Sequence, residues 1–581
     1  MGDASGVTVP AARRMAAKTN ADGILGRLDP DQRAAASVPS GPLLIIAGPG
    51  TGKTRTLTHR IAHLVSERGV DPGEILAITF TRRAAAEMAE RLSTLASQHA
   101  EALTVTTFHS LGLRVLREQH ALAGLPRDFS IADPERQLAV AIESTGDPAE
   151  AKRLLAEGRR DGAPQFAAYL AALHDHGLVD LDDLIALPVA LLDEHPDLAA
   201  AYRDRWRWVF VDEYQDIDDT QYRLLRLLAP ANGNLTAIGD PDQAIYRFRG
   251  ADVGFFLRFE QDYTDAAVTQ LSRNYRSGAT ILEGAVQLVA PTTLVTDRRL
   301  DPAGGLPDLP IRVHGAASES AEAAFVATTV DHLLGGATFT SRDAASHDAS
   351  TELGFNDIAV LYRTDGQSRA IGEALTRAGF PYQKRSHDRL RDRPGVAELL
   401  NELRFAADAP TVHKRLLLAA DALRSREGAD PSILDSAVDL LAPLALRCGT
   451  DADRFRDELS LGIEVDTWDP RADRITLLTL HASKGLEFPC VFVVGCEDGL
   501  LPLRWGETSD EEIAEERRLL FVGMTRAQRH LYLSHAAERY RHGTTRAATR
   551  SPFLSDLDPR LTETIAAPKP KRPKAIQPRL L

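Results

Sequence analysis

Three glycines lie between an apolar run and a helix-like stretch in PLLIIAGPGTGKTR, residues 42–55: Gly48, Gly50 and Gly52. Glycines in such a loop let backbone N–H groups approach phosphate oxygens, and a helix start adds about half a positive charge. Lys53 would reach the β- and γ-phosphates, and the Thr54 hydroxyl would hold Mg²⁺. The usual pattern has Gly where this chain has Ala47, which is also small. The stretch predicts a phosphate site, since a Gly-rich turn alone leaves the Gly-Lys-Thr triplet unexplained.

Two adjacent carboxylates follow another apolar run. Residues 208–211 predict a short buried strand, and Asp212 and Glu213 come directly after it. Carboxylates at the end of a buried strand are costly unless a cation or water meets them. Asp212 would hold Mg²⁺, and Glu213 would orient and deprotonate an attacking water. A solvated acidic turn is the simpler alternative.

Amide and aromatic side chains supply a third set of chemical groups. Gln243 follows a further apolar run, where its amide could sense a γ-phosphate, and Gln32 in LDPDQR could read an adenine edge. Tyr246, Phe248 and Arg249 come within six residues of Gln243 and combine stacking faces with a cation, as in proteins that bind single strands. Taken alone, such aromatic residues more often belong to a core.

The elements that must position these groups alternate between strand and helix. Strand-like runs occur at 43–46, 75–80, 104–108, 208–211 and 235–238, and helical patterns occur at 57–66 and 81–92. This alternation predicts a parallel doubly wound α/β sheet with ligands at the carboxyl ends of its strands. Residues 112–204 contain no convincing strand, which predicts a helical insertion. Strand-like runs return at 311–314, 358–362, 474–480, 491–494 and 531–534.

Bulk properties bound the class of protein. The 581 residues predict two to four domains, and 44% apolar with 26% charged residues is ordinary for a soluble protein. The net charge of 68 − 82 = −14 argues mildly against nucleic acid as a ligand, although a basic groove can coexist with an acidic exterior. Three cysteines fit a reducing compartment and make no metal cluster. We expect neither a membrane span nor a signal peptide.

Ten motifs together resemble the UvrD/Rep/PcrA family of superfamily 1 DNA helicases. They occur in the family's order over about residues 28–560. The motifs are Gln32, AGPGTGKTR (47–55), ITFTRRAAAEM (78–88), TTFHS (106–110), VDEYQD (211–216), IGDPDQAIYRFRGA (238–251), RNYRS (273–277), VLYRT (360–364), TLHASKGLEF (479–488) and VGMTRA (522–527). The resemblance implies two RecA-like P-loop NTPase motor domains, α/β in class, that close over ATP and open after hydrolysis.

The resemblance also implies roles for individual residues in an ATP and Mg²⁺ site. Arg55 and Tyr275 would sandwich the adenine, Arg276 and Arg526 would contact the γ-phosphate, and Glu487 would lie near the ribose. The implied catalytic residues are Lys53, Asp212, Glu213, Gln243, Arg276 and Arg526, with Thr54 and Asp212 as metal ligands. The implied nucleotide-binding residues are Gln32, Ala47, Gly48, Pro49, Gly50, Thr51, Gly52, Lys53, Thr54, Arg55, Tyr275 and Glu487.

For DNA, the resemblance implies a single-strand groove formed by aromatic and cationic side chains. Its residues would be Phe80, His109, Tyr246, Phe248, Arg249 and His481. This chain departs from the family at Phe248, where Trp is usual. Phenylalanine can still stack on a base, but with less area, so we expect only a modest loss of affinity.

The resemblance divides the chain into two motor domains with insertions. The expected parts are a flexible leader (1–24), a first motor domain 1A (25–111 and 205–280), a helical insertion 1B (112–204), a second motor domain 2A (281–398 and 472–560), a short helical 2B remnant (399–471) and a basic Pro-rich tail (561–581). The 2B part is much shorter than the family's full subdomain. Residues 341–354 are expected to form a surface loop, and no nuclease domain is expected.

The leading hypothesis is therefore an ATP-dependent DNA helicase or translocase acting on single-stranded DNA and its junctions with duplex, in repair or replication-associated processing. Its 3′→5′ polarity is inherited from the resemblance. The alternative is a translocase that strips proteins, or an accessory subunit that needs a partner to unwind. A small-molecule kinase would leave TLHASKGLEF and VGMTRA unexplained. We expect a cytoplasmic, nucleoid-associated protein with a repair or nuclease protein as a possible partner.

Overall fold

The computed structural model describes residues 23–158, 164–335, 353–385, 390–406, 409–426, 430–462, 472–504, 506, 508–541 and 543–566. Three expectations fall wholly or largely outside these residues. They are the leader up to residue 22, the surface loop over residues 341–352, and the basic tail from residue 567.

The first sheet domain is built on six parallel strands. In spatial order they are β3 (Thr104–Thr107), β2 (Ile75–Thr79), β6 (Trp208–Val211), β7 (Asn234–Gly239), β1 (Leu43–Ala47) and β8 (Ala267–Leu271). All five strands predicted for this half are present. Both β1 and β2 are buried along their whole length, as continuous apolar runs in a parallel sheet require. The edge strand β8 was not predicted.

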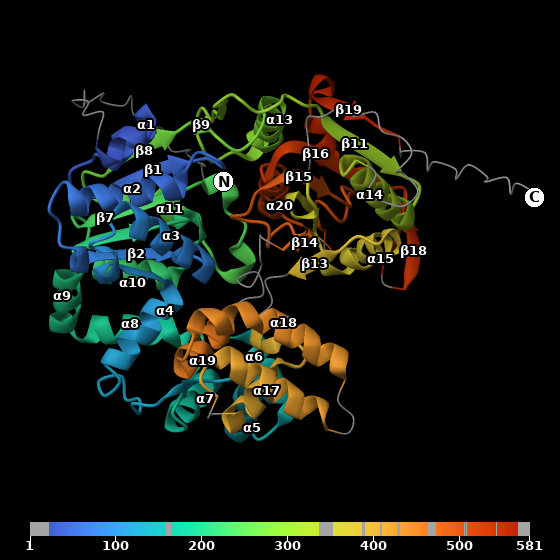
Figure 1. Ribbon diagram of the computed structural model, residues 1–581. Coiled ribbons are helices and arrows are strands. Elements are labelled where there is room, and N and C mark those ends of the chain that lie inside the picture. Colours follow the sequence, from blue (N-terminus) through green and yellow to red (C-terminus); the bar gives the residue numbers. More distant parts are fainter. Residues whose placement is uncertain are drawn as a thin grey trace, which may run out of the picture.

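Helices cover both faces of this sheet (Figure 1). Several start where a strand has just ended, because a side-chain oxygen there caps the first turn: Thr81 accepts from the Ala84 N–H and Thr107 from the Ser110 N–H. The helices are η1 (Ile24–Arg27), α1 (Pro30–Ala36), α2 (Lys53–Ser66), η2 (Pro72–Glu74), α3 (Arg82–Leu95), η3 (Ala100–Ala102), α4 (Phe108–Glu118), η4 (Tyr214–Asp216), α10 (Asp219–Leu228), η5 (Pro241–Gln243), η6 (Arg247–Arg249), α11 (Gly254–Leu257) and α12 (Phe259–Asp262).

Between β3 and β6 the chain forms a helical insertion. Its helices are α5 (Pro134–Thr145), α6 (Pro148–Glu157), α7 (Pro164–Asp175), α8 (Asp183–Glu194) and α9 (Pro196–Arg205). Proline opens four of them, which suits its fixed φ and missing N–H. The expectation that this region lacks strands was wrong, because β4 (Ser130–Ile131) pairs with β5 (Leu178–Val179). Two residues are too few to show an alternating pattern.

The second sheet domain has seven parallel strands. In spatial order they are β13 (Tyr382–Arg385), β14 (Ile475–Thr479), β12 (Ile358–Tyr362), β15 (Phe488–Val493), β16 (Ala527–Ala536), β11 (Ile311–Ala316) and β19 (Thr562–Thr564). Its helices are α13 (Ala279–Val289), η7 (Ala290–Thr292), α14 (Glu319–Leu333), η8 (Phe355–Asp357), η9 (Asp365–Gln367), α15 (Ser368–Ala378), α20 (Asp510–Met524), η13 (Pro552–Asp556) and η14 (Pro559–Leu561). The five strands predicted here are present, and the two edge strands were not predicted.

Two small pairings complete the second half. A parallel pair of β9 (Arg273–Asn274) and β10 (Asp301–Pro302) lies where the chain passes between the sheet domains. An antiparallel hairpin of β17 (Glu538–Arg541) and β18 (Thr544–Ala547) extends from the end of β16.

A helical unit is inserted between β13 and β14. It comprises η10 (Leu390–Asp392), α16 (Val396–Leu403), η11 (Arg404–Ala406), α17 (Val412–Arg424), α18 (Pro431–Cys448) and α19 (Ala452–Leu461). The unit has its own apolar core, which begins at Leu390, ahead of the residue 399 at which the short remnant was expected to start. Figure 1 shows it beside α5, α6 and α7, and Arg391 Nη2 lies 3.0 Å from Asp133 Oδ2 of the insertion.

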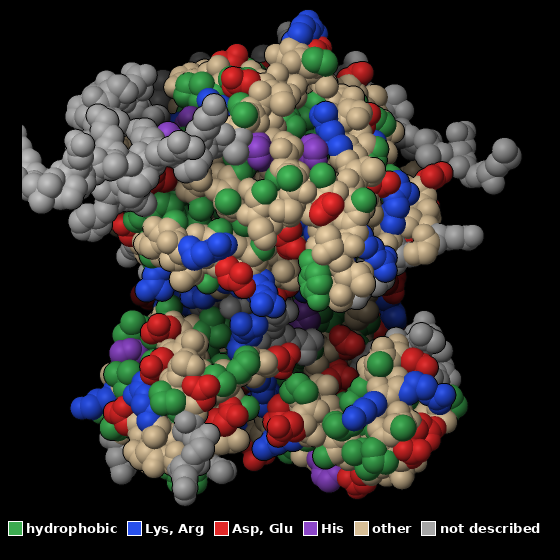
Figure 2. Space-filling view, turned by 90° about the vertical axis from the view of Figure 1, so that its right-hand side faces the viewer, with side chains coloured by type: hydrophobic (Ala, Val, Ile, Leu, Met, Phe, Trp, Pro, Cys, Tyr) green, Lys and Arg blue, Asp and Glu red, His purple; other side chains and the backbone are tan. Residues whose placement is uncertain are grey.

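The two sheet domains lie side by side, and the two helical parts lie together below them (Figure 1). Figure 2 shows a recess between this upper body and the lower lobes, with Lys and Arg side chains near its edge. Within the described part of the chain, no helix is long and apolar enough to cross a membrane.

Candidate functional site

The phosphate loop follows β1 and is held open by close neighbours. Gly50 and Gly52 have φ angles of 67° and 81°, which only glycine adopts without strain. A Cβ on Gly52 would lie 2.6 Å from Gln32 Nε2. Lys53 donates to the carbonyls of Ala47 (3.1 Å) and Gly48 (3.3 Å), so its ammonium lies inside the loop, where phosphate oxygens could replace those carbonyls.

The rest of the loop is tied down by hydrogen bonds. Thr51 Oγ1 donates to Gly48 O (2.8 Å), and Asn274 Nδ2 donates to Pro49 O (2.5 Å). Thr54 lies in the first turn of α2 and is partly exposed. The loop is therefore shaped before any ligand arrives, as a phosphate cradle requires.

Gln32 and Tyr275 meet at the mouth of the loop. Gln32 Nε2 donates to Thr51 O (2.9 Å), and the Tyr275 N–H donates to Gly50 O (2.8 Å). The Tyr275 hydroxyl donates to Asp29 Oδ2 (2.6 Å), and its side chain is 45% exposed. Burial, and then the bond to Asp29, raise the pKa of Tyr275 to about 12. An exposed ring beside a phosphate loop can stack on a purine.

Arg55, the expected second wall of an adenine slot, points elsewhere in this structure. Its Nη2 donates to Arg27 O (2.5 Å). The cation over the Tyr275 ring is Arg273, whose Cζ lies 5.7 Å from the ring centre. A stack of purine between Arg55 and Tyr275 would therefore need Arg55 to leave the Arg27 carbonyl.

Asp212 and Glu213 follow β6 directly. The Asp212 N–H continues the sheet by donating to Ile78 O (2.9 Å). Glu213 has φ 52°, in the left-handed region, and its N–H donates to Asp212 Oδ1 (2.9 Å). This strained turn holds both carboxylates close enough to Lys53 of the phosphate loop for its charge to act on them.

The surroundings shift the pKa values of the two carboxylates in opposite directions. Burial, and then the charge of Glu213, raise the pKa of Asp212 to about 7. Burial acts the same way on Glu213, but the nearby ammonium groups of Lys53 and Lys484 outweigh it and lower the pKa of Glu213. Glu213 is thus the firmly ionised member, as a group that accepts a proton from water at neutral pH must be.

The residues present fit a magnesium ion shared with phosphates. Among the described residues no three His, Cys, Asp or Glu side chains cluster as a metal cage. Mg²⁺ usually takes one or two carboxylates and completes its shell with phosphate oxygens and water. Asp212 and the Thr54 hydroxyl supply hard oxygen ligands of that kind beside the loop.

An arginine from the second sheet domain reaches this site. Arg526, at the end of α20, is 1% exposed, and its Nη2 donates to Gln243 Oε1 (3.3 Å) of the first domain. Its Nε and Nη1 are fixed by the carbonyls of Val522 (2.9 Å) and Leu486 (3.2 Å). Burial, and then the charge of Arg276, lower the pKa of Arg526 to about 9. A positive group held this tightly is preorganised for an anion.

Arg276 and Glu487 form an ion pair across the same boundary. Arg276 Nε lies 2.7 Å from Glu487 Oε2, and Gln528 Nε2 donates to Glu487 Oε1 (3.2 Å). Burial would raise the pKa of Glu487, but Arg276 lowers it. The structure therefore brings Arg276, Arg526 and Glu487 together, with Arg276 paired to a carboxylate that a phosphate would have to replace.

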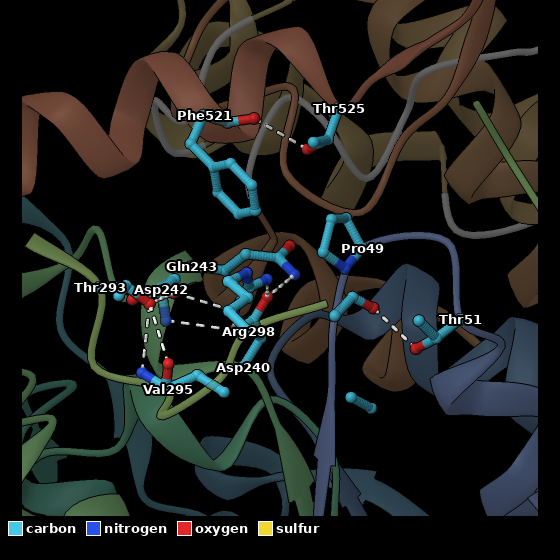
Figure 3. A network of polar contacts seen from close by, with 12 residues as sticks. Pro49, Thr51, Asp240, Asp242, Gln243, Thr293, Val295, Arg298, Phe521 and Thr525 are labelled. Atoms are coloured by element: carbon cyan, nitrogen blue, oxygen red, sulfur yellow. Dashed lines mark hydrogen bonds and ion pairs between the residues drawn. The ribbon is translucent and has the colours of Figure 1, made fainter. Parts of the chain in front are cut away.

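Sequence reasoning missed several residues that organise this site. Lys484 of the second domain donates to the Asp216 carboxylate and to Gln243 O (2.6 Å), and lies 3.9 Å from Glu213 Oε2. It stands inside the quoted motif TLHASKGLEF, so its motif position was an available signal. Asp240 and Arg298 also belong here (Figure 3), and Arg298 lies outside every quoted motif.

A second group of side chains lies around Tyr246. Its ring stacks on Phe80, with ring centres 5.1 Å apart, and its hydroxyl donates to His481 O (3.3 Å) of the second domain. Phe248 is 65% exposed and meets His481 edge-on at 5.2 Å. Arg249 lies over both aromatic rings, 5.7 Å from Tyr246 and 5.5 Å from Phe248. Stacking faces and a cation are therefore concentrated here, at the boundary between the sheet domains.

Four of the six expected DNA-binding residues line one cavity of about 430 Å³. They are Phe80, His109, Tyr246 and Arg249. Ser460 and Leu461 of α19 close another side, so the inserted helical unit borders the same cavity. Phe248 and His481 lie beside it rather than in its wall. Tyr246 is only 2% exposed, so it offers little of its ring to a ligand in this state.

The fold defines a class: a P-loop NTPase with two RecA-like domains, and here side chains of the second domain meet the candidate site on the first. The chain belongs to the UvrD/REP helicase family. The family model for the UvrD/REP helicase N-terminal domain matches residues 28–160 and 147–264. The model for the UvrD-like helicase C-terminal domain matches residues 269–417 and 454–538.

Curated relatives are similar over nearly the whole chain. The ATP-dependent DNA helicase UvrD1 of Mycobacterium tuberculosis is 34% identical, with 95% of this chain and 87% of the relative covered. The ATP-dependent DNA helicase PcrA of Leuconostoc citreum is 31% identical, with 92% and 85% covered. PcrA of Bacillus subtilis is 31% identical, with 96% and 89% covered.

Proposed function

We propose that this protein is an ATP-dependent DNA helicase that moves 3′→5′ along single-stranded DNA. The single observation that carries the proposal is the bond from Arg526 of one sheet domain to Gln243 of the other, beside the phosphate loop. Through this bond, the rate of hydrolysis would depend on the relative position of the two sheet domains. The family membership and the printed activity of the relatives support the substrates, ATP and DNA.

Hydrolysis would use the groups in the positions described. Lys53 holds the β- and γ-phosphates, and Glu213 accepts a proton from the attacking water. Arg526 and Arg276 stabilise the negative charge that develops as the terminal bond breaks. Mg²⁺, held by Thr54 and Asp212, would neutralise phosphate charge. Gln32 and Tyr275 would position the base.

Movement would follow from groups that serve both sites. Lys484 contacts the carboxylate of Asp216 and lies 5.2 Å from the ring centre of Tyr246. A change in the separation of the domains at the phosphates would thus be felt at Tyr246, and through Phe80 along the groove. Bases would stack on the exposed Phe248 and bind against His109, Arg249 and His481.

The test compares two tailed duplexes under identical conditions. We expect unwinding of a duplex with a 3′ single-stranded tail, no unwinding with a 5′ tail, and ATP hydrolysis stimulated by single-stranded DNA. Lys53→Ala is the control and should lose hydrolysis while it retains salt-sensitive DNA binding. An ATPase rate indifferent to DNA of any length would refute the proposal.

A second candidate function is an ATP-driven translocase that strips proteins or needs a partner to unwind. The short helical unit η10–α19 favours it, because this unit is bound to the insertion through Arg391 and Asp133. Translocation without unwinding of either tailed duplex would select it. A repair or nuclease protein would then be the partner, at the nucleoid.

A further inference from the structure

The segment that leads from the first to the second sheet domain carries a buried arginine. Arg298 lies in this segment, and its side chain is 5% exposed. Its Nη1 and Nη2 lie 2.7 Å from Oδ1 and Oδ2 of Asp240, and Nη1 lies 2.9 Å from Asp242 Oδ2. Figure 3 shows the guanidinium between these carboxylates and Gln243.

The carboxylates on either side are fully buried, and Arg298 affects them differently: burial raises the pKa of Asp242 in spite of Arg298. Burial would raise the pKa of Asp240, but Arg298 outweighs it and lowers that pKa. Asp242 is held further by the Thr293 hydroxyl (2.5 Å) and the Leu294 N–H (2.7 Å), both from the same segment. A bidentate pair of this kind fixes the direction of the carboxylate as well as its charge.

The fixed carboxylate in turn fixes the side-chain amide of Gln243. Asp240 Oδ2 accepts from Gln243 Nε2 (2.8 Å), so the other end of the amide, Oε1, is turned toward Arg526 (3.3 Å). A rotated amide would present N–H groups to the guanidinium and break this contact. The orientation of Gln243 thus depends on Asp240, and that of Asp240 on Arg298.

Two further contacts connect Arg298 with both sides of the site. Its Cζ lies 4.9 Å from the ring centre of Phe521, on α20 of the second sheet domain, and Figure 3 shows that ring directed toward the network. On the other side, a Cβ on Gly48 would lie 3.4 Å from Arg298 Nη2 and 2.5 Å from Leu300 Cδ2. The phosphate loop and α20 therefore approach the same guanidinium.

We propose that Arg298 is a positioning residue for ATP hydrolysis, which acts through Asp240 to orient Gln243 and through Phe521 to make that orientation depend on the second domain. The inference rests on the proposed function and extends it to a residue outside the recognised motifs. The Nη atoms of Arg298 are bound by Asp240 and Asp242, so it would act by setting the geometry of Gln243.

The experiment replaces Arg298 with lysine, which keeps the charge but loses the two-pronged fork. We expect kcat for DNA-stimulated ATP hydrolysis to fall about 10- to 100-fold, as for a small misplacement of a catalytic group. KM for ATP and DNA affinity without nucleotide should change less than about threefold. The matched control is Arg299→Lys at the neighbouring position. The Arg299 side chain is 75% exposed, so this substitution should leave kcat unchanged.

A double variant separates positioning from general destabilisation. In a Gln243→Ala background, Arg298→Lys should lower kcat no further, because residues that act as a unit are not additive. An equal loss in both backgrounds, or a wild-type rate for Arg298→Lys, would overturn the inference. Absence of DNA-stimulated hydrolysis in the wild-type protein would instead overturn the proposed function.

A second variant covers the case in which Arg298→Lys does not fold, as shown by its thermal unfolding midpoint. Phe521→Leu leaves all the ion pairs of Arg298 in place and keeps an apolar side chain on α20. We expect a smaller loss of kcat than for the arginine, and again none in the Gln243→Ala background. A wild-type rate for Phe521→Leu, or a loss that persists without Gln243, would count against the inference.

Discussion

Arg526 shows what a single buried cation contributes to this molecule. It lies at the end of α20 with its guanidinium fixed by backbone carbonyls, yet its remaining donors face Gln243 on the other sheet domain. Desolvation makes such a charge costly unless an anion meets it, and we propose that the γ-phosphate of ATP is that anion. On this proposal, Arg526 would bind the γ-phosphate only when the two domains are closed.

Replacing Arg526 tests the proposal that its guanidinium binds the γ-phosphate. We expect Arg526→Ala to slow DNA-stimulated ATP hydrolysis by about 10³-fold or more, the size of an arginine-finger effect, with the fold intact. Steady-state kinetics and a thermal unfolding midpoint measure the two parts of this statement. The control is Arg560→Ala on the same domain, whose side chain is 83% exposed. A near-normal rate would make Arg526 a structural residue.

At this scale the sequence predicted which residues follow a buried strand where they stand in short motifs; their roles remain predictions. Lys53, Asp212 and Gln243 owe their positions to the strand immediately before them, so spacing alone locates them. Arg298 could not be found this way, because its contacts with Asp240 and Asp242 depend on the path of a loop between the domains. Nor could the pairing of Arg276 with Glu487, which are 487 − 276 = 211 positions apart.

Close helix packing sets the relation between the first sheet domain and its helical insertion. Helix α4 starts at the end of β3, and Gly112 in its first half faces the backbone of α8. A Cβ there would lie 1.6 Å from the carbonyl oxygen of Leu184, which is backbone and cannot turn away. The absence of a side chain at one position therefore lets the two helices touch.

Gly112→Ala should consequently destabilise the protein by about 3 kcal/mol or more, since the helices must separate to admit one methyl group. Thermal unfolding of the purified variant measures the change. Gly366→Ala is the matched control, because nothing lies within 4 Å of its Cβ position and its φ is not positive. Equal midpoints for the two variants would show that α4 and α8 can move apart freely.

On β16, His530 is buried with Nε2 lacking a partner among the described residues and Nδ1 beside Arg312 (3.3 Å). Burial, and then Arg312, lower its pKa to about 4 from an ordinary 6.5. Between pH 6.5 and pH 4, His530 is therefore neutral in the folded state but protonated in the unfolded chain. Its contribution to the free energy of unfolding is complete above pH 6.5 and is lost as pH falls toward 4.

We expect His530→Leu to reduce the acid sensitivity of the protein. Relative to its own stability at pH 7.5, the variant should lose about 2 kcal/mol less than the wild type on transfer to pH 5. Unfolding midpoints of both proteins at the two pH values provide the comparison. Parallel losses would place the His530 pKa near its ordinary value.

Element types were predictable where burial makes a sequence uniform. The wholly buried β1, β2 and β12 are continuous apolar runs and were expected within a residue of their ends. The edge strands β8, β13 and β19 are only partly buried, and their mixed composition gives no such signal. Core position made most strands visible in the sequence, whereas the partly buried edge strand β3, with the sequence TVTT, was predicted from its β-branched residues.

The two sheet domains repeat one strand order with different ends. The spatial order in the first sheet is β8-β1-β7-β6-β2-β3. The corresponding order in the second sheet is β19-β11-β16-β15-β12-β14, so β11 occupies the position that β1 has in the first. After β11, however, no glycine loop follows. The space near its end holds Arg539, paired with Glu322 (2.5 Å) and Glu497 (2.6 Å), all three buried.

This network predicts one nucleotide per chain. Glu322 and Glu497 would repel a phosphate, and Arg539 is already neutralised by them, so the described residues at the end of β11 offer no second phosphate site. Equilibrium dialysis of a non-hydrolysable ATP analogue should give a stoichiometry of one, and Lys53→Ala should weaken that same site. A second site that survives Lys53→Ala would contradict the prediction.

The position of β1 in its sheet has a consequence for synthesis on the ribosome. β1 pairs with β7 and β8 and with no other described strand, although it precedes both by a long stretch of chain. A growing polypeptide makes 239 − 47 = 192 further residues before β7 is complete. At about 5–20 residues per second this takes roughly 10–40 s. Throughout that time Leu43–Ala47 is an unpaired apolar segment, open to chaperones, and nucleotide binding has to wait until the first domain is almost fully translated.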